Sequence, residues 1–387
     1  MIHTSDCIGC QACADCCPKN AISFSFDTWG EGRACVIEDK CIKCGLCARI
    51  CPALNKKYNP VMPQVLAVRS KSNSEIGSSG GVFHELAKEF IEQGGLVYGA
   101  AFNDELKLVH MCAEKIEDLP RLCKSKYLHS DMSGIYREIK EHLNSGRKIM
   151  FVGTPCQTSA VKNLFADEKG DMLILVDFLC HGTGTQKVFD ICIKKEEEKE
   201  QGQIKDFSFR SKSRNAEHSY SYTLLKDGKI VKRSGYGFEF PYYNSYLKYN
   251  IFSDACYECP YAKRERVGDI TLGDFWGIQK YNKRLNDRKG VSMISLNTQS
   301  GQALFEKIEN RCTVYRYPIE YAADHNESFN RPVKYPEQKK RYFAILKTEG
   351  EDKLVEQLSC KNVKKEIIYA KTPDFVKRVY DVIRGRK

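Results

Sequence analysis

Two cysteine-rich loops that repeat each other at a fixed distance constrain this chain more than any other feature. The first loop, CIGCQACADCCP, begins at Cys7, and the second, CIKCGLCARICP, begins at Cys41. Both follow the order C-x2-C-x2-C-x3-C-P, and each cysteine of the second loop lies 34 residues after its counterpart in the first. Cys16 maps onto Ile50 and falls outside the repeat, so we interpret it, like Cys35, as a packed residue.

Eight cysteines in this arrangement indicate two four-iron, four-sulfur clusters. Three closely spaced cysteines wrap one cluster, and the fourth, which leaves the loop before a proline, ligates the other cluster. A zinc site needs only four ligands and has no use for such an octet. We therefore assign the cysteines to two sets: Cys7, Cys10, Cys13 and Cys51, and Cys41, Cys44, Cys47 and Cys17.

The segment that joins the two loops completes a small domain. Alternating apolar and polar residues at 21–26 and 33–38 flank the turn region WGEG, which predicts a two-stranded hairpin. Residues 1–59 are therefore predicted to form an α+β two-cluster ferredoxin domain, followed by a proline-containing linker.

Composition places the chain among ordinary globular proteins of a reducing compartment. Its 19 cysteines stand at metal-ligand spacings in 387 residues, whereas disulfide scaffolds are short, and no signal region precedes Cys7. A cytoplasmic protein is therefore expected. The formal charge of +11 does not favour nucleic acid, because three clusters and a dinucleotide would offset most of it.

Beyond residue 60 the pattern changes to apolar strands that alternate with amphipathic helices. Strands are expected at 65–70, 96–102, 107–113, 147–153, 171–179, 269–275 and 291–298, with helices among them. This alternation predicts an α/β domain with parallel strands over residues 60–335. A hairpin is expected to turn at Asp227 and Gly228.

A second group of cysteines emerges from this domain. Cys156 and Cys180 each follow an apolar strand, and parallel neighbours would bring both thiols to the same sheet edge. Cys256 and Cys259 supply a C-x2-C pair, so four thiolates would suit a third cluster. The alternative is that the first two are core cysteines and the pair binds nothing or half a zinc site. The remaining cysteines show no partner spacing and are interpreted as structural: Cys112, Cys123, Cys192, Cys312 and Cys360.

The glycine-rich GSSGG segment and the C-terminus carry weaker signals. No dinucleotide-binding glycine motif and no phosphate-binding P-loop are present, but GSSGG precedes a predicted helix and suits either an anion seat or a flexible turn. Residues 336–387 are expected to form a basic helical tail. Its last segment, 372–387, is expected to be an amphipathic helix that either packs on the body or docks on a membrane or an acidic partner.

An ordered series of motifs extends the interpretation. They are GSSGGVF (77–83), KSKYLHS (124–130), VGTPCQ (152–157), DFLCHG (177–182), FSFR (207–210) and CYECPYAKRERVGDITLGDFWG (256–277). This series closely resembles the coenzyme F-420 hydrogenase/dehydrogenase beta-subunit family, whose relatives include chlorophyll-pathway reductases that keep an N-terminal two-cluster ferredoxin. The resemblance covers about residues 1–330.

The resemblance implies an α/β flavin and iron–sulfur domain, with FAD beside a third four-iron cluster. The cluster ligands would be Cys156, Cys180, Cys256 and Cys259. Flavin contacts would come from the glycine turn and from later motifs, and Lys126 would lie near the isoalloxazine. His181 is a candidate proton donor, or a residue that supports its neighbour Cys180. The cofactor-binding candidates are Ser79, Gly80, Gly81, Lys126, Tyr127, Arg210, Asp274 and Trp276.

These features predict an enzyme that passes electrons between a ferredoxin-type one-electron partner and a two-electron substrate. The substrate would be the deazaflavin coenzyme F-420 or another reducible organic molecule. The alternatives are an electron-input subunit of a larger hydrogenase or dehydrogenase complex, and a polyferredoxin-like carrier without flavin.

Overall fold

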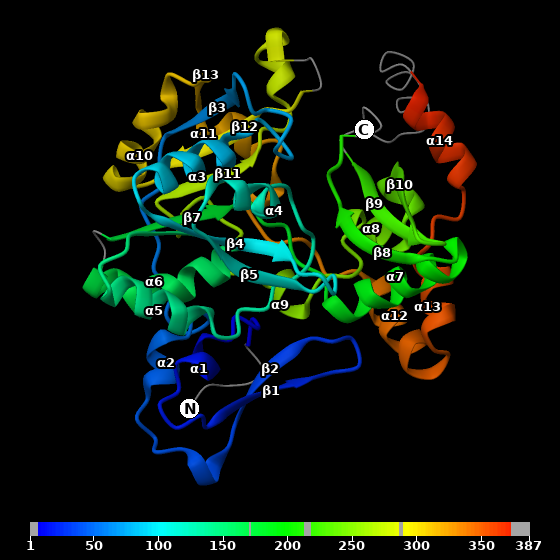
Figure 1. Ribbon diagram of the computed structural model, residues 1–387, viewed down its shortest axis with the longest axis horizontal. Helices are drawn as coiled ribbons and strands as arrows, with labels where there is room; N and C mark the ends of the chain where they lie inside the picture. Colours follow the sequence, from blue (N-terminus) through cyan, green and yellow to red (C-terminus); the bar gives the residue numbers. More distant parts are fainter. Residues whose placement is uncertain (1–6, 170–171, 213–217, 286–288, 373–387) are drawn as a thin grey trace.

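The computed structural model describes residues 7–169, 172–212, 218–285 and 289–372 and arranges them in three parts (Figure 1). A small cysteine-rich domain lies below a large sheet with helices on both faces, and a second lobe flanks the sheet. The amphipathic segment 372–387 lies outside the described residues from position 373 onward. Among the described helices, none is long and apolar enough to cross a lipid bilayer.

The N-terminal domain shows its duplication in the backbone as well as in the sequence. Its hairpin pairs β1 (Ile22–Phe26) with β2 (Gly32–Val36), and each cysteine loop contains a short helix, α1 (Ala12–Asp15) in the first and α2 (Leu46–Ile50) in the second. Gln11 and Gly45, 34 residues apart, both have positive φ and precede these helices. The two loops therefore bend in the same way, which confirms the ferredoxin-type layout of this domain.

The large sheet has eight strands in the order β13-β3-β12-β11-β7-β6-β4-β5. Its parallel centre is β11 (Ile270–Asp274), β7 (Leu173–Phe178), β6 (Ile149–Val152) and β4 (Leu96–Phe102). The flanking strands β5 (Leu108–Ala113), β12 (Ser292–Leu296), β3 (Gln64–Ser70) and β13 (Cys312–Pro318) each pair antiparallel with a neighbour. The sheet is thus mixed: its centre has the parallel strands that the sequence predicts, whereas its flanking strands pair antiparallel. Long-range pairing decides strand direction, and an apolar run looks the same in either direction.

Helices cover both faces of this sheet (Figure 1). On one face, α3 (Val82–Glu92) and α10 (Gln299–Glu309) bury their apolar sides in one core cluster with the strands. On the other face lie α5 (Ile135–Asn144) and α6 (Pro155–Lys169), which pack above the N-terminal domain. This second face therefore joins the sheet to the cysteine-rich domain.

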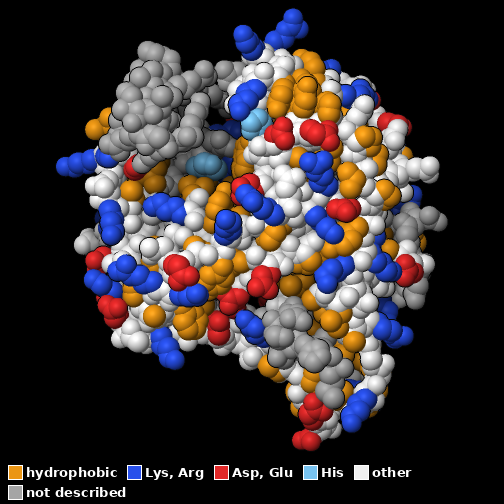
Figure 2. Space-filling model, turned by 180° about the vertical axis from the view of Figure 1, so that it is seen from behind, with side chains coloured by type: hydrophobic (Ala, Val, Ile, Leu, Met, Phe, Trp, Pro, Cys, Tyr) orange, Lys and Arg blue, Asp and Glu red, His pale blue; other side chains and the backbone are white. Residues whose placement is uncertain are grey.

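The second lobe contains a three-stranded antiparallel sheet: β8 (Gln203–Ser208), β9 (Ser219–Lys226) and β10 (Lys229–Tyr236). Helices α7 (Gln186–Glu200), α8 (Pro241–Leu247), α12 (Glu337–Thr348) and α13 (Glu351–Leu358) complete its core, and α14 (Val363–Lys371) follows. Residues 337–358 therefore pack in the core of this lobe and do not form part of a separate tail. Seen from behind, basic and acidic side chains intersperse over the surface (Figure 2).

The N-terminal domain is docked by buried contacts. Trp29, in the hairpin turn, is fully buried in the core of the second lobe, and its carbonyl accepts from Thr185 Oγ1 at 2.6 Å. On α1, the buried Asp15 accepts from the Tyr136 N–H at 2.9 Å and from Arg137 Nε at 2.8 Å, so it caps the start of α5. Because both anchors are buried, the domain is fixed against the rest of the chain.

Candidate functional site

Five strands of the large sheet, β3, β4, β6, β7 and β11, run in the same direction and end at one edge. Cys156 lies just after β6, and Cys180 just after β7. These two strands are hydrogen-bonded parallel neighbours, with Val152 opposite Val176. The expectation that both cysteines reach the same edge of the sheet is therefore met by the structure.

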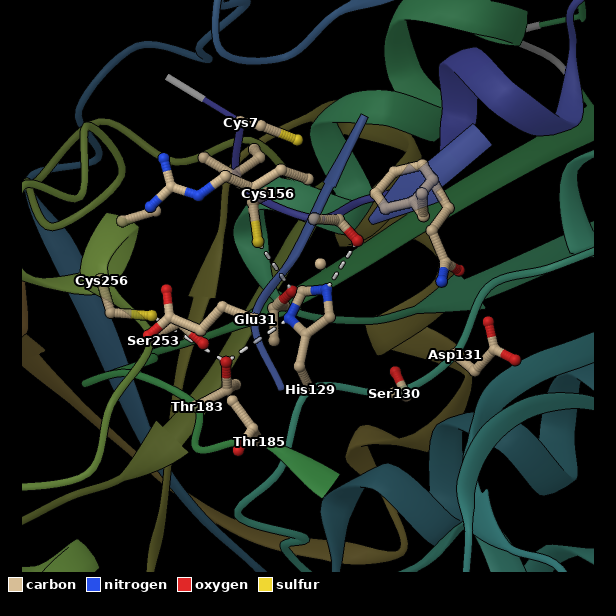
Figure 3. A pocket seen from close by; sticks show the side chains of 18 of the residues that line it. Cys7, Glu31, His129, Ser130, Asp131, Cys156, Thr183, Thr185, Ser253 and Cys256 are labelled. Carbon is tan, nitrogen blue, oxygen red and sulfur yellow. Dashed lines mark hydrogen bonds between the residues drawn. The ribbon is translucent and has the colours of Figure 1, made fainter. Parts of the chain in front are cut away.

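Cys256 and Cys259 come from a different part of the chain and reach the same place. Cys256 lies on the short helix α9 (Asp254–Tyr257), whose preceding residue Ser253 donates its N–H to Thr183 O at 2.8 Å. Thr183 follows Cys180 closely in sequence, so this bond draws α9 to the sheet edge. All four thiols line one cavity of about 740 Å³ between the sheet edge and the N-terminal domain, with the Cys156 and Cys256 sulfurs facing into it (Figure 3).

The four thiols affect one another electrostatically. Burial, together with the neighbouring thiols Cys256, Cys156 and Cys259, raises the pKa of Cys180 well above its usual range. Burial likewise raises the pKa of Cys156 to about 11 and that of Cys256 to about 12. Burying four thiolates costs free energy of folding unless a cation offsets their negative charge. The donor set therefore fits a metal cluster better than four packed thiols.

Backbone N–H groups are directed at these sulfurs. Cys259 accepts from the N–H groups of Tyr261 and Ala262, Cys180 from that of Gly182, and Cys156 from that of Gln157. Such donors stabilise negative charge on cluster ligands and raise reduction potentials. The site thus offers both the ligands and the surrounding hydrogen bonds that a four-iron cluster uses.

The N-terminal cysteines separate into an inner and an outer set. Cys7, Cys10, Cys13 and Cys51 line a second, smaller cavity together. Burial raises the pKa of Cys13 to about 12, and the nearby Cys7 and Cys51 contribute to that rise. The fourth cysteine of the second loop therefore joins the first three of the first loop, as the crossed assignment predicts.

The outer set, Cys17, Cys41, Cys44 and Cys47, is closer to solvent. Cys44 is exposed and the other three are half-buried, and the Ala21 N–H donates to Cys17 Sγ at 3.3 Å. Exposed charged side chains lie within three residues of these cysteines in the sequence. The basic ones are Lys19, Lys40, Lys43 and Arg49, and the acidic ones are Glu38 and Asp39.

The inner set adjoins the sheet-edge thiols. The charge of Cys156 contributes to the raised pKa of Cys10, and Cys7 lines both cavities. Tyr261, two residues after Cys259, donates its hydroxyl to Pro52 O at 2.7 Å, beside Cys51. The three thiol sets therefore follow one another from the solvent-facing end of the N-terminal domain to the edge of the sheet.

The residues expected to contact flavin gather on a neighbouring part of the same edge. Arg210 is buried and donates to Asp274 Oδ2 at 2.9 Å, Tyr127 Oη at 3.2 Å and Ser78 O at 3.1 Å. Lys212 donates to Ser79 O at 3.3 Å. The structure thus brings the glycine turn, Tyr127, Arg210 and Asp274 together.

The glycine turn has features of a ligand cradle. A Cβ on Gly80 would lie 2.3 Å from Val68 O, and Gly81 has φ +79°, so both positions require glycine. Ser79 Oγ is buried and has no hydrogen-bond partner among the described residues. An unpaired buried hydroxyl beside two cationic side chains fits a phosphate of a bound nucleotide.

The remaining predicted residues take separate positions. Lys126 Nζ donates to Leu122 O at 2.9 Å and Cys123 O at 2.7 Å, and burial lowers its pKa to about 7. His181 lines the 740 Å³ cavity and packs against Trp276 at 5.0 Å between ring centroids. Burial lowers the pKa of His181 to about 4, so its imidazole is neutral at pH 7. Lys126 and Trp276 are not among the described residues that line this cavity.

Two contacts near the thiols were not anticipated from the sequence. His129 Nε2 lies 3.1 Å from Gly9 O, and its Nδ1 lies 3.4 Å from Thr183 Oγ1, so it links the first cysteine loop to the sheet-edge site. Lys339 bridges Glu31 and Asp254, which lie 223 residues apart. No local pattern marks these residues, because their partners are set by the tertiary fold.

Comparison with known protein families identifies two domains in this chain. Residues 6–55 match the 4Fe-4S dicluster domain, and residues 146–320 match the C-terminal domain of the coenzyme F-420 hydrogenase/dehydrogenase beta subunit. The search of curated proteins finds no match. Among solved structures, the chain is similar to one in the F-420-reducing [NiFe] hydrogenase complex from Methanosarcina barkeri. That likeness has 16% identity and a TM-score of 0.45, over 78% of this chain and 94% of the other.

The two family matches fall on separate parts of the chain and agree with the observed architecture. The dicluster match contains all eight repeated cysteines, and the second match contains Cys156, Cys180, Cys256 and Cys259. Residues 146–320 therefore form a C-terminal domain of the coenzyme F-420 hydrogenase/dehydrogenase beta-subunit type, and in this chain it follows an N-terminal 4Fe-4S dicluster domain.

Proposed function

We propose that this chain is an iron–sulfur flavoprotein oxidoreductase that connects a one-electron protein partner to a two-electron organic substrate. The observation that carries the proposal is the gathering of Cys156, Cys180, Cys256 and Cys259 around one cavity directly beside the inner thiol set. Coenzyme F-420 is the substrate class that the family suggests. Bound in these sites, iron–sulfur clusters would supply one-electron transfer and FAD would supply two-electron hydride chemistry.

The chain's own residues supply placement and electrostatics. Trp29 and Asp15 hold the N-terminal domain against the sheet, which keeps the inner thiol set beside the sheet-edge set. Backbone N–H groups directed at Cys180 and Cys259 favour the charged form of the sulfurs. Arg210, Lys212 and the Ser79 hydroxyl would hold the FAD phosphates, and His181, which lines the cavity, would support its neighbour Cys180.

The proposal is tested by anaerobic purification followed by cofactor analysis and turnover assays. Three clusters and one flavin would give about 12 irons and about one FAD per chain. Oxidation of reduced ferredoxin by the isolated chain, coupled to reduction of F-420, would support an enzyme with its own substrate. Flavin reduction without turnover would assign it instead as an electron-input subunit, and iron without flavin would contradict the proposal.

The Ser79 hydroxyl provides a specific check on the flavin site. In Ser79→Ala we expect FAD affinity to fall about 10-fold or more, because one hydrogen bond to a charged phosphate is lost. The free energy of unfolding should stay within about 0.5 kcal/mol of wild type, because no described protein partner of this oxygen is lost. Equilibrium titration of FAD into flavin-free protein measures the affinity. Unchanged affinity would place the phosphates elsewhere.

The solvent-facing thiol set predicts where the protein partner docks. Lys40 and Lys43 are exposed and adjoin Cys41 and Cys44, so their ammonium groups would attract an acidic ferredoxin. We expect Lys40→Glu/Lys43→Glu to slow reduction by an acidic ferredoxin about 10-fold at low ionic strength, with less effect at high salt. Stopped-flow absorbance measures this rate. The matched control is Lys229→Glu, an exposed lysine in the β9–β10 hairpin, and equal slowing by both changes would contradict docking at the outer set.

A further inference from the structure

Three side chains of the types that bind transition metals meet away from the thiol sets. Cys112, Glu138 and His142 place their ligand atoms within 4.8 Å of one another, and each is half-buried. They lie at the β5 edge of the large sheet, on the face covered by α5 (Figure 1). The sequence interpretation treats Cys112 as a structural residue without partners, and the structure supplies partners from another element.

Regular secondary structure positions these ligands. In the antiparallel β4–β5 pair, Tyr98 lies directly opposite Cys112, so their side chains share one face of the sheet. Glu138 and His142 are four residues apart on α5 and therefore share one face of that helix. Ile139, between them, packs in the same core cluster as Tyr98, so the helix is held against this face.

The fully buried Tyr98 links the group. Its hydroxyl donates to Glu138 Oε1 at 3.0 Å and lies 2.7 Å from His142 Nδ1. Hydrogen bonds between ligands do not by themselves make a metal site. Here, however, a thiol, an imidazole, a carboxylate and a phenol converge from two strands and a helix, and the three ligands keep partial access to solvent.

The chemistry of the donors selects the ion. A thiolate and a carboxylate carry two negative charges and the imidazole is neutral, so a divalent cation would make the site neutral. Mixed sulfur, nitrogen and oxygen donors suit Zn²⁺, whereas Mg²⁺ and Ca²⁺ take oxygen ligands and four-iron clusters take four thiolates. Three protein ligands also leave a fourth tetrahedral position, which water or the Tyr98 oxygen would fill.

We propose that Cys112, Glu138 and His142 form a zinc site that clamps the edge strand β5 to α5. Binding would release the Cys112 thiol proton to solvent and replace the hydrogen bonds of Tyr98 with bonds to the metal. The site lies on the helix that supports the inner thiol set. Tyr136, also on α5, donates its hydroxyl to Cys10 O at 2.7 Å. The zinc would therefore stiffen the helix on which the inner thiol set rests.

The test uses the complete protein with its iron sites loaded, purified anaerobically and dialysed after addition of Zn²⁺. We expect about one retained zinc per chain, and a zinc-edge X-ray absorption spectrum with one sulfur and three nitrogen or oxygen neighbours. Cys112→Ser, Glu138→Gln and His142→Ala should each weaken zinc affinity by at least the roughly 10- to 100-fold that loss of an outer-shell partner costs.

Cys123→Ser is the matched control, because Cys123 is a buried cysteine outside this group, and its zinc content should equal that of wild type. Zinc with four sulfur neighbours would place the ion at empty cluster thiols and overturn the proposal. Failure to retain zinc at matched iron content would overturn it as well, as would a zinc content that none of the three ligand substitutions changes. Glu138→Gln keeps the size of the side chain and remains informative should the other variants fold poorly.

Discussion

Cys256→Ser is expected to lower the iron content from about 12 to about 8 atoms per chain and to abolish reduction of a two-electron acceptor by ferredoxin. The serine oxygen would replace one of the four thiolates around the sheet-edge cavity, and the loss of this ligand is expected to destabilise the cluster. The eight N-terminal cysteines lie in a separate domain with its own fold, so their irons should remain and should still be reduced by ferredoxin.

A matched variant separates this effect from general damage to the fold. Cys192 is a buried cysteine on α7, in the core of the second lobe and away from the cavity, so Cys192→Ser should keep about 12 irons and retain turnover. Iron analysis and stopped-flow reduction of both variants give the comparison. If Cys256→Ser kept the full iron content, this cysteine would not be a cluster ligand.

The second large effect is expected at Lys339, which ties three parts of the chain together. Its Nζ lies 2.6 Å from Glu31 Oε1, in the N-terminal hairpin, and also contacts Asp254 Oδ1 at the start of α9. The Lys339 side chain is 3% exposed and that of Glu31 is 8% exposed. Lys339→Met would leave Glu31 as a buried acid without its cation, which costs about 3–5 kcal/mol of unfolding free energy.

Denaturant unfolding of the iron-loaded protein measures this loss. Lys340→Met is the control, because Lys340 is the next residue on α12 and forms an ion pair with the exposed Glu337, so a change below about 1 kcal/mol is expected. Adding Glu31→Gln to Lys339→Met should recover part of the loss, because the unpaired charge is removed. Equal destabilisation by the changes at 339 and 340 would contradict the assigned role of the buried lysine.

The same substitution has a consequence for the thiol site. Asp254 precedes Cys256 on α9, and its N–H donates to the Glu31 carboxylate at 3.0 Å. Loosening this contact should make the sheet-edge iron more accessible to chelators in Lys339→Met than in Lys340→Met. Timed iron release to a chromogenic chelator measures the difference.

The features that the sequence predicts well are local ones. The duplication of the two cysteine loops is visible as a spacing of 34 residues, and the structure repeats it in the matching backbone turns at Gln11 and Gly45. Cys156 and Cys180 were predictable as neighbours because each follows a buried strand. Cysteine spacing and runs of apolar residues are local features, so they can be recognised in the sequence without knowledge of the tertiary fold.

The features that the sequence did not reveal depend on long-range pairing. The sequence does not predict the strand β13, and an apolar run does not indicate the antiparallel direction of β12. The contacts of Trp29 with the second lobe and of Lys339 with Glu31 join segments more than 150 residues apart. The cluster of Cys112 with Glu138 and His142 also depends on tertiary contacts, and a lone cysteine in a strand has no partner spacing that would predict it.

The gathering of twelve thiols into three sets of four is tested most directly by anomalous X-ray diffraction at the iron edge, from crystals grown without oxygen. The account predicts three iron peaks, the third enclosed by Cys156, Cys180, Cys256 and Cys259 and adjacent to the peak at Cys10. Two iron peaks, both in the N-terminal domain, would contradict it.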